Sequence, residues 1–114
     1  MKKDPEVGLE VAKIFKLMKE ISPGKAVELR VPPYGAIQCG KGAIHRRGTP
    51  PNQVEMSAVT LIHLVINPES WPGLMDQGEI RASGLASDLS KLFIQVSVKY
   101  QAGIKSFLAS NGVD

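Results

Sequence analysis

Apolar side chains recur every three or four residues near the start of the chain, and lysines and glutamates occupy many of the positions between them. A helix turns once in about 3.6 residues, so this spacing puts the apolar side chains on one face. Residues 5–21 are therefore predicted to form an amphipathic helix that begins at Pro5 and ends at Ser22-Pro23-Gly24. Its mixed charges favour packing against a core over lying on a membrane. The face that packs would carry Val7, Val11, Ile14, Phe15, Met18 and Ile21.

From residue 25 the period changes to two. Val27, Leu29 and Val31 alternate with charged residues, which predicts a half-buried strand over residues 25–31. Residues 34–39 and 43–47 flank Gly40-Lys41-Gly42, and a short glycine turn between two such runs predicts a hairpin. Two further strands are predicted over residues 53–56 and 79–83.

The segment over residues 57–66 is apolar on almost every side. A helix capped by Ser57 fits it, and a strand is an alternative because the run is rich in β-branched residues. As a helix, it must either be buried on both sides or present its second face to a ligand or partner. That face would carry Val59, Leu64 and Ile66.

Two more helical regions are predicted beyond this segment. Asn67-Pro68-Glu69 has the cap, proline and acid typical of a helix start, and the short helix would end at Gly78. After the candidate caps Ser87 and Asp88, apolar spacing predicts a long helix to about Leu108. Apolar residues also alternate over residues 94–100, so a strand followed by a helix is the alternative there.

The composition indicates one globular domain over residues 1–114, because 43% of the 114 residues are apolar and 22% are charged. The predicted helices and strands make it an α+β domain. Cys39 is the single cysteine, which excludes a disulfide scaffold, a zinc ribbon and an iron–sulfur cluster. The longest apolar run is too short to span a membrane, and charged residues interrupt the start of the chain where a signal peptide would be apolar. A cytoplasmic protein is expected.

The net charge is +3, and the positive charges are unevenly spread. No acidic residue lies between Glu28 and Glu55, whereas this stretch holds four basic ones, Arg30, Lys41, Arg46 and Arg47. A basic edge is predicted that could meet an anionic ligand or, at most, the surface of a membrane. Nucleic acid is not an expected partner, because the chain has six aromatic residues and no recognisable nucleic-acid-binding module.

Few residues could carry out covalent chemistry. Cys39 could act as a nucleophile with His45 or His63 as its base, but the spacing matches no thiol-enzyme or metal-site signature. Cys39 is expected to be buried, and His63 to be a hydrogen-bonded core histidine. No catalytic residue, metal or cofactor is predicted, so the protein is expected not to be an enzyme.

Four blocks of the sequence stand out: VPPYGAIQC (residues 31–39), HRRGTPPNQVEM (45–56), GEIRASG (78–84) and SDLS (87–90), of which the two longest are specific rather than compositional. They resemble the bacterial sterol carrier protein family. The resemblance covers residues 5–93 and leaves residues 94–114 as an extra C-terminal segment that could line or plug a cavity. It implies a mostly antiparallel sheet covered by helices around an apolar cavity that holds a lipid.

The resemblance further implies non-catalytic binding or carriage of a lipid-like apolar ligand. The alternative is an interaction or homodimerisation module that uses the apolar helix 57–66. The pocket of a lipid carrier would be lined by Leu61, Ile62, Val65, Trp71, Leu74, Met75, Ile80, Leu89 and Phe93. These residues would accept many kinds of acyl chain.

A polar cluster in the predicted hairpin is the candidate for binding the head group of such a ligand. Its members are His45, Arg46, Arg47 and Thr49. On a regular strand His45 and Arg47 share a face, which leaves Arg46 to the other side of the strand or to a nearby carboxylate such as Glu55.

Overall fold

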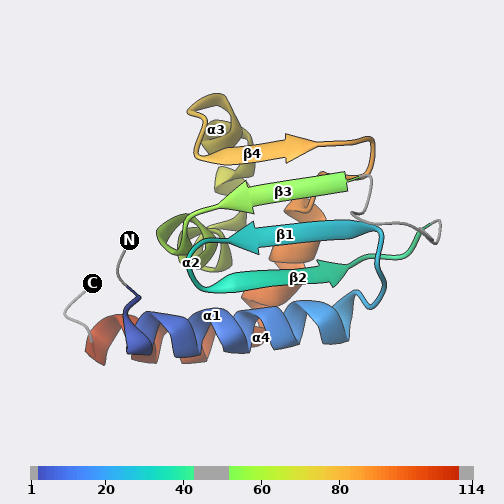
Figure 1. Ribbon diagram of the computed structural model, residues 1–114. Coiled ribbons are helices and arrows are strands. Elements are labelled where there is room, and N and C mark those ends of the chain that lie inside the picture. The colour runs from blue at the N-terminus through green and yellow to red at the C-terminus, as the bar shows by residue number, and fades with distance from the viewer. Residues whose placement is uncertain (1–2, 43–51, 111–114) are drawn as a thin grey trace.

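A mixed four-stranded β-sheet organises the part of the chain that the structure describes (Figure 1). This computed structural model describes residues 3–42 and 52–110, with side chains as far as Tyr100. The sheet has the strand order β2-β1-β3-β4, and β1 pairs with β3 in parallel while the other two pairs are antiparallel. The predicted mostly antiparallel α+β fold is therefore confirmed. The strands are β1 (Val27–Val31), β2 (Gly35–Cys39), β3 (Asn52–Met56) and β4 (Ile80–Ser83).

A tight turn at Pro32, Pro33 and Tyr34 joins β1 and β2 into a hairpin. The Tyr34 N–H donates to the carbonyl of Val31 over 2.8 Å. Prolines suit this position because a turn requires no ladder hydrogen bond from them. The sequence predicts a different hairpin, between residues 34–39 and 43–47. The second of these segments lies outside the described residues, and the partner that the structure describes for β2 is β1.

The helices cover one face of the sheet. Helix α1 (Pro5–Ile21) lies along β2, and α2 (Ala58–Ile66) and α4 (Ser90–Ser110) lie behind the strands in the view of Figure 1. The 3-10 helix η1 (Pro68–Ser70) and the short helix α3 (Trp71–Asp76) connect α2 to β4. No helix of the described chain covers the opposite face (Figure 1), where Arg30 and Arg81 are exposed.

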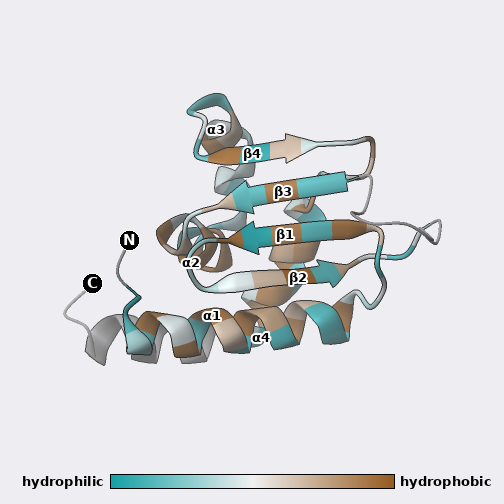
Figure 2. Ribbon diagram, viewed as in Figure 1, coloured by the Kyte–Doolittle hydropathy of each residue, from teal (hydrophilic) through white to brown (hydrophobic). Residues whose placement is uncertain are grey.

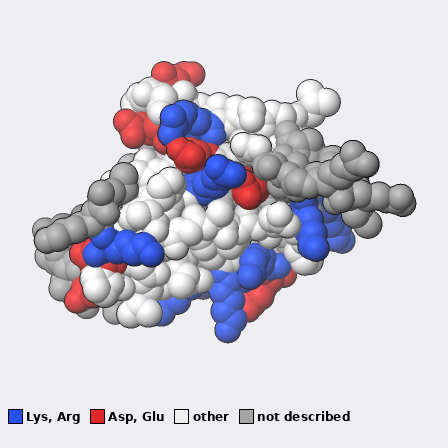
Figure 3. Space-filling view, viewed as in Figure 1, with Lys and Arg blue, Asp and Glu red and all other residues white. Residues whose placement is uncertain are grey.

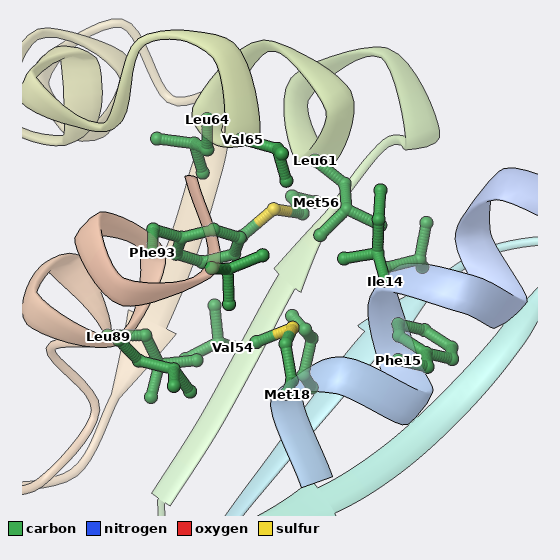
Figure 4. Close-up of a cluster of buried hydrophobic side chains, with 14 of the residues drawn as sticks. Ile14, Phe15, Met18, Val54, Met56, Leu61, Leu64, Val65, Leu89 and Phe93 are labelled. Atoms are coloured by element: carbon green, nitrogen blue, oxygen red, sulfur yellow. The ribbon is translucent and has the colours of Figure 1, made fainter. Parts of the chain in front are cut away.

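The core lies between the sheet and the helices (Figure 4). Along β1 the buried residues alternate with Glu28 and Arg30, and this alternation is visible as brown and teal bands in Figure 2. Burial of one face by the helices explains why the period of β1 is two. Side chains that are at most 1% exposed include Ile14, Met18, Leu29, Val54, Leu61, Leu64, Val65, Phe93 and Val96.

Residues 58–66 form a helix, so the alternative of a strand over this run is wrong. Ser57 caps it as predicted, because its hydroxyl oxygen accepts the N–H of Thr60 over 3.1 Å. The helical turn places Leu61, Leu64 and Val65 together against the sheet and α4. Tertiary packing therefore outweighs the strand preference of the β-branched residues.

The last element is one continuous helix, so the alternative of a strand over residues 94–100 is also wrong. Asp88, one of the predicted caps, lies two residues before it, and its carboxylate accepts the N–H of Ser90 over 2.9 Å. Hydrogen bonds from Ser90 lower the pKa of Asp88. Phe93 is fully buried, whereas Ile94 is 51% exposed. Exposed apolar residues on the outer face of this helix produced the misleading alternation.

Candidate functional site

Most residues predicted to line a lipid pocket lie in one buried cluster. Trp71 and Phe93 pack with their ring centroids 6.1 Å apart. Leu74 is half-buried at the edge of the cluster, whereas Met75 is 36% exposed. The other members are buried side chains from α2, β4, α4 and the residue before α4: Leu61, Ile62, Val65, Ile80, Leu89 and Phe93. The structure thus brings the predicted set together, with Met75 at the surface, and its role in binding a lipid stays a prediction.

A groove of about 520 Å³ opens at one end of the sheet. Five segments meet there: the start of α1, the β1–β2 turn, the end of β3, the start of α2 and the residues around the start of β4. Its volume falls in the range of small-molecule pockets. The residues that line it are Val7, Pro32, Pro33, Tyr34, Glu55, Met56, Ser57, Ala58, Val59, Gly78, Glu79 and Arg81.

The greater part of this groove has an apolar lining. Met56 ends β3 and is buried, and Val59 lies in the first turn of α2 with 78% of its side chain exposed. Pro32 and Pro33 contribute the wall at the β1–β2 turn. A ligand in the groove could cover Val59 and remove its side chain from water.

The groove has a fixed wall on the side of α1. The Tyr34 hydroxyl accepts the N–H of Asp4 over 3.0 Å, which ties the β1–β2 turn to the start of the helix. A Cβ built on Gly8 would lie 3.4 Å from the ring of Tyr34, so the helix approaches this ring closely. The carboxylate of Asp4 caps α1 by accepting the N–H groups of Glu6 and Val7. Val7 is thereby positioned at the mouth of the groove.

The opposite wall of the groove is charged. Arg81 on β4 forms an ion pair with Glu55 on β3, which lies directly across the strands from it. Glu79 lines the same end and is exposed. The pairing continues across the open face of the sheet, where Arg30 donates to Glu28 over 2.6 Å. Figure 3 shows these acidic and basic side chains in an alternating band.

The predicted head-group residues His45, Arg46, Arg47 and Thr49 lie outside the described residues. The sequence pairs Arg46 with a carboxylate such as Glu55, whereas the described partner of Glu55 is Arg81. Cys39 at the end of β2 and Asn52 at the start of β3 both align with Val27, the first residue of β1. The groove lies beyond the other end of β1.

The structure offers no thiol chemistry at Cys39. This side chain is fully buried, and burial raises the pKa of its thiol to about 11.

His63 is exposed, so the prediction of a core histidine is wrong; its Nε2 lies 3.1 Å from the Ser70 hydroxyl. Within residues 3–42 and 52–110, no group of three acidic, histidine or cysteine side chains could hold a metal ion.

Helix α2 offers little to a partner. Leu64, which the sequence places on the second face of this helix, is fully buried, and Ile66 is half-buried. Helix α4 and η1 both pack against α2 and account for this coverage. Val59, at the groove, is the large apolar residue of α2 that remains exposed.

Sequence reasoning missed the groove residues, although two signals pointed to them. Pro32-Pro33-Tyr34 lies in one of the specific blocks, and Val59 is an apolar residue that the helix pattern leaves outside the core.

In the described part of the chain, no helix has the length and apolar content of a membrane span. Residues 5–94 match the model of a protein family described as bacterial SCP ortholog, SCP being sterol carrier protein. No curated protein matches the chain.

Proposed function

Because the chain belongs to the bacterial sterol carrier protein family, we propose that it binds and carries a lipid-like apolar ligand and catalyses no reaction. The family match covers 5–94, a range that includes every residue lining the groove. The observation that carries the proposal is the apolar lining of this groove. An apolar chain in it would cover side chains that are now in contact with water.

The groove and the predicted lipid-binding residues are neighbours through Met56. This side chain lines the groove and also points toward Leu61 and Val65 in the core (Figure 4). Methionine is flexible and adapts to irregular apolar shapes. We place the ligand's chain along Met56 in the groove, with the predicted cluster forming the wall behind it.

A second candidate function, dimerisation through α2, has weaker support. Its apolar second face is covered apart from Val59. A single exposed valine falls far short of the apolar area that a stable interface buries. Lipid binding therefore accounts better for the exposed position of Val59 beside a groove.

Replacing Val59 with Asp tests the proposed site. Val59 is exposed, and an acid in the first turn of a helix is favourable, so the variant should fold normally. A carboxylate in the lining should weaken binding of an uncharged fluorescent alkyl probe by at least about tenfold. Fluorescence titration measures this affinity and the expected one-to-one limit.

Leu85→Asp is the matched control, because Leu85 is fully exposed and does not line the groove. It makes the same chemical change and should leave probe affinity as in the wild type. Equal affinities for the two variants would place the ligand elsewhere in the molecule. A wild-type protein that binds no alkyl probe would contradict the proposed function itself.

A further inference from the structure

The charged end of the groove carries more negative than positive charge. Among the described residues that line this end, Glu55 and Glu79 carry carboxylates and Arg81 carries a guanidinium. Arg81 is already engaged by Glu55, so this pair is close to neutral as seen by a ligand. Glu79 has no ion-pair partner among the residues that the structure describes. One carboxylate is therefore left to face the groove's contents.

The start of α2 contributes charge of the opposite sign. Ser57 and the first N–H groups of this helix border the groove, and a helix N-terminus is equivalent to about half a positive charge. One of these N–H groups is already hydrogen-bonded, since the N–H of Thr60 donates to the Ser57 hydroxyl, and this reduces the positive potential. The full negative charge of Glu79 exceeds the half positive charge at the start of α2, so this end of the groove is negative.

We propose that the groove prefers single-chain amphiphiles with a protonated amine head group over those with a carboxylate. The proposal rests on the lipid-binding function proposed above. The alkyl chain lies along Pro33, Met56 and Val59, and the ammonium group lies at Glu79. An amine gains attraction from this carboxylate, and a carboxylate head is repelled by it.

The preference is modest in size because Glu79 is exposed to water. Exposed ion pairs contribute little, and repulsion of the carboxylate adds a similar amount in the same direction. We expect an amine to bind about five- to tenfold more tightly than a carboxylate with the same chain at low salt. Salt at about 1 M should remove most of the difference, since it screens exposed charges.

Competition against the uncharged fluorescent probe tests this preference. Dodecylamine, dodecanol and dodecanoate share one chain and differ in head-group charge at pH 7. The expected order of affinity is amine, alcohol, carboxylate. Glu79→Gln should bring the three affinities to within about twofold of one another.

Asp76→Asn is the matched control for charge. Asp76 is exposed at the end of α3 and does not line the groove, so its loss should keep the order of affinities. Equal displacement by all three compounds would overturn the amine preference and leave the lipid-binding function standing. Preference for dodecanoate would also overturn it and would favour the predicted head-group residues Arg46 and Arg47. Failure of all three to compete would contradict both proposals.

Discussion

Gly24 and Gly40 meet where the chain leaves α1 and enters the sheet. Gly24 has a φ of 141°, and a Cβ at this position would lie 1.9 Å from the carbonyl oxygen of Gly40. That carbonyl accepts the N–H of Ala26, and the Gly40 N–H donates to Ser22. The close approach of two backbones thus needs a residue without a side chain.

Gly24→Ala should lower the free energy of unfolding by more than about 2 kcal/mol. Strained backbone and a clash with a backbone carbonyl both oppose the added methyl group, and neither can be relieved by rotating a side chain. Urea denaturation followed by circular dichroism measures the change.

Gly73→Ala is the control for this substitution. Nothing lies within 4 Å of a Cβ at Gly73, which is in helix α3, so alanine there should be neutral or stabilising by up to about 1 kcal/mol. If the two variants were equally stable, the clash would not be the reason for glycine at position 24.

At the scale of elements, a polar contact ties the first helix to the last. The Tyr100 hydroxyl on α4 donates to the carboxylate of Glu10 on α1 over 3.0 Å. Glu10 is 6% exposed, and Lys13 donates to its other oxygen over 3.4 Å. A buried carboxylate thus has hydrogen bonds to both oxygens, which offsets the cost of removing it from water.

This contact predicts a loss of stability at high pH. Burial, followed by the hydrogen bond to Glu10 and its negative charge, raises the pKa of Tyr100 from 10.0 to about 12. Between these values the unfolded chain releases a proton that the folded chain keeps. The contribution of Tyr100 to stability is therefore complete below pH 10 and is lost as pH rises toward 12.

Tyr100→Phe isolates this effect from the titration of the lysines. The variant should be less stable than the wild type by about 1–2 kcal/mol at pH 7, because it loses a hydrogen bond to a charged group. The gap should narrow between pH 10 and 12. A constant gap across this range, in urea denaturation at each pH, would argue against the Tyr100–Glu10 contact.

At the scale of the whole molecule, the sheet separates a buried face from an open one. The helices cover the face that carries Leu29 and Val54, whereas charged side chains pair on the other. Phe93 is central to the covered side, since it is fully buried and packs beside Trp71. The stability of the fold therefore depends on the single apolar layer between the sheet and the helices.

Phe93→Ala should cost about 3–5 kcal/mol, the usual cost of removing a buried phenylalanine. Trp71, the only tryptophan in the chain, reports on the same layer, and its emission should shift to longer wavelength in the variant. Ile94→Ala, one residue away on the exposed side of α4, should cost less than about 1 kcal/mol. Similar costs for the two variants would contradict the placement of this helix.

Local patterns were sufficient for most elements of the fold. The helix over 5–21, the strand ending at Val31 and the cap at Ser57 each depend on neighbouring residues, so their spacing and chemistry could be interpreted without the rest of the chain. The specific blocks also pointed to the bacterial sterol carrier protein family, to which the chain belongs. Those blocks include the strands β2, β3 and β4, and recognising them depends on no contact.

Tertiary structure decided what local patterns leave open. Which side of α2 is buried depends on α4 and η1, and for this reason Leu64 is covered and His63 is at the surface. Asn52 could not be singled out either: it is buried because its amide donates to Ala26 and accepts from Ala86, both over 2.9 Å. Such roles arise from residues that are distant in the chain.

The groove is the clearest case. Its lining comes from segments as far apart as Val7 and Arg81, and parallel pairing of β1 with β3 brings the β1–β2 turn beside the start of α2. The sequence by itself determined that the chain has apolar surface to spare and which family it resembles. Only the packing of the sheet and helices decided that Val59 stays exposed beside a hollow, because burial depends on which distant elements reach a side chain.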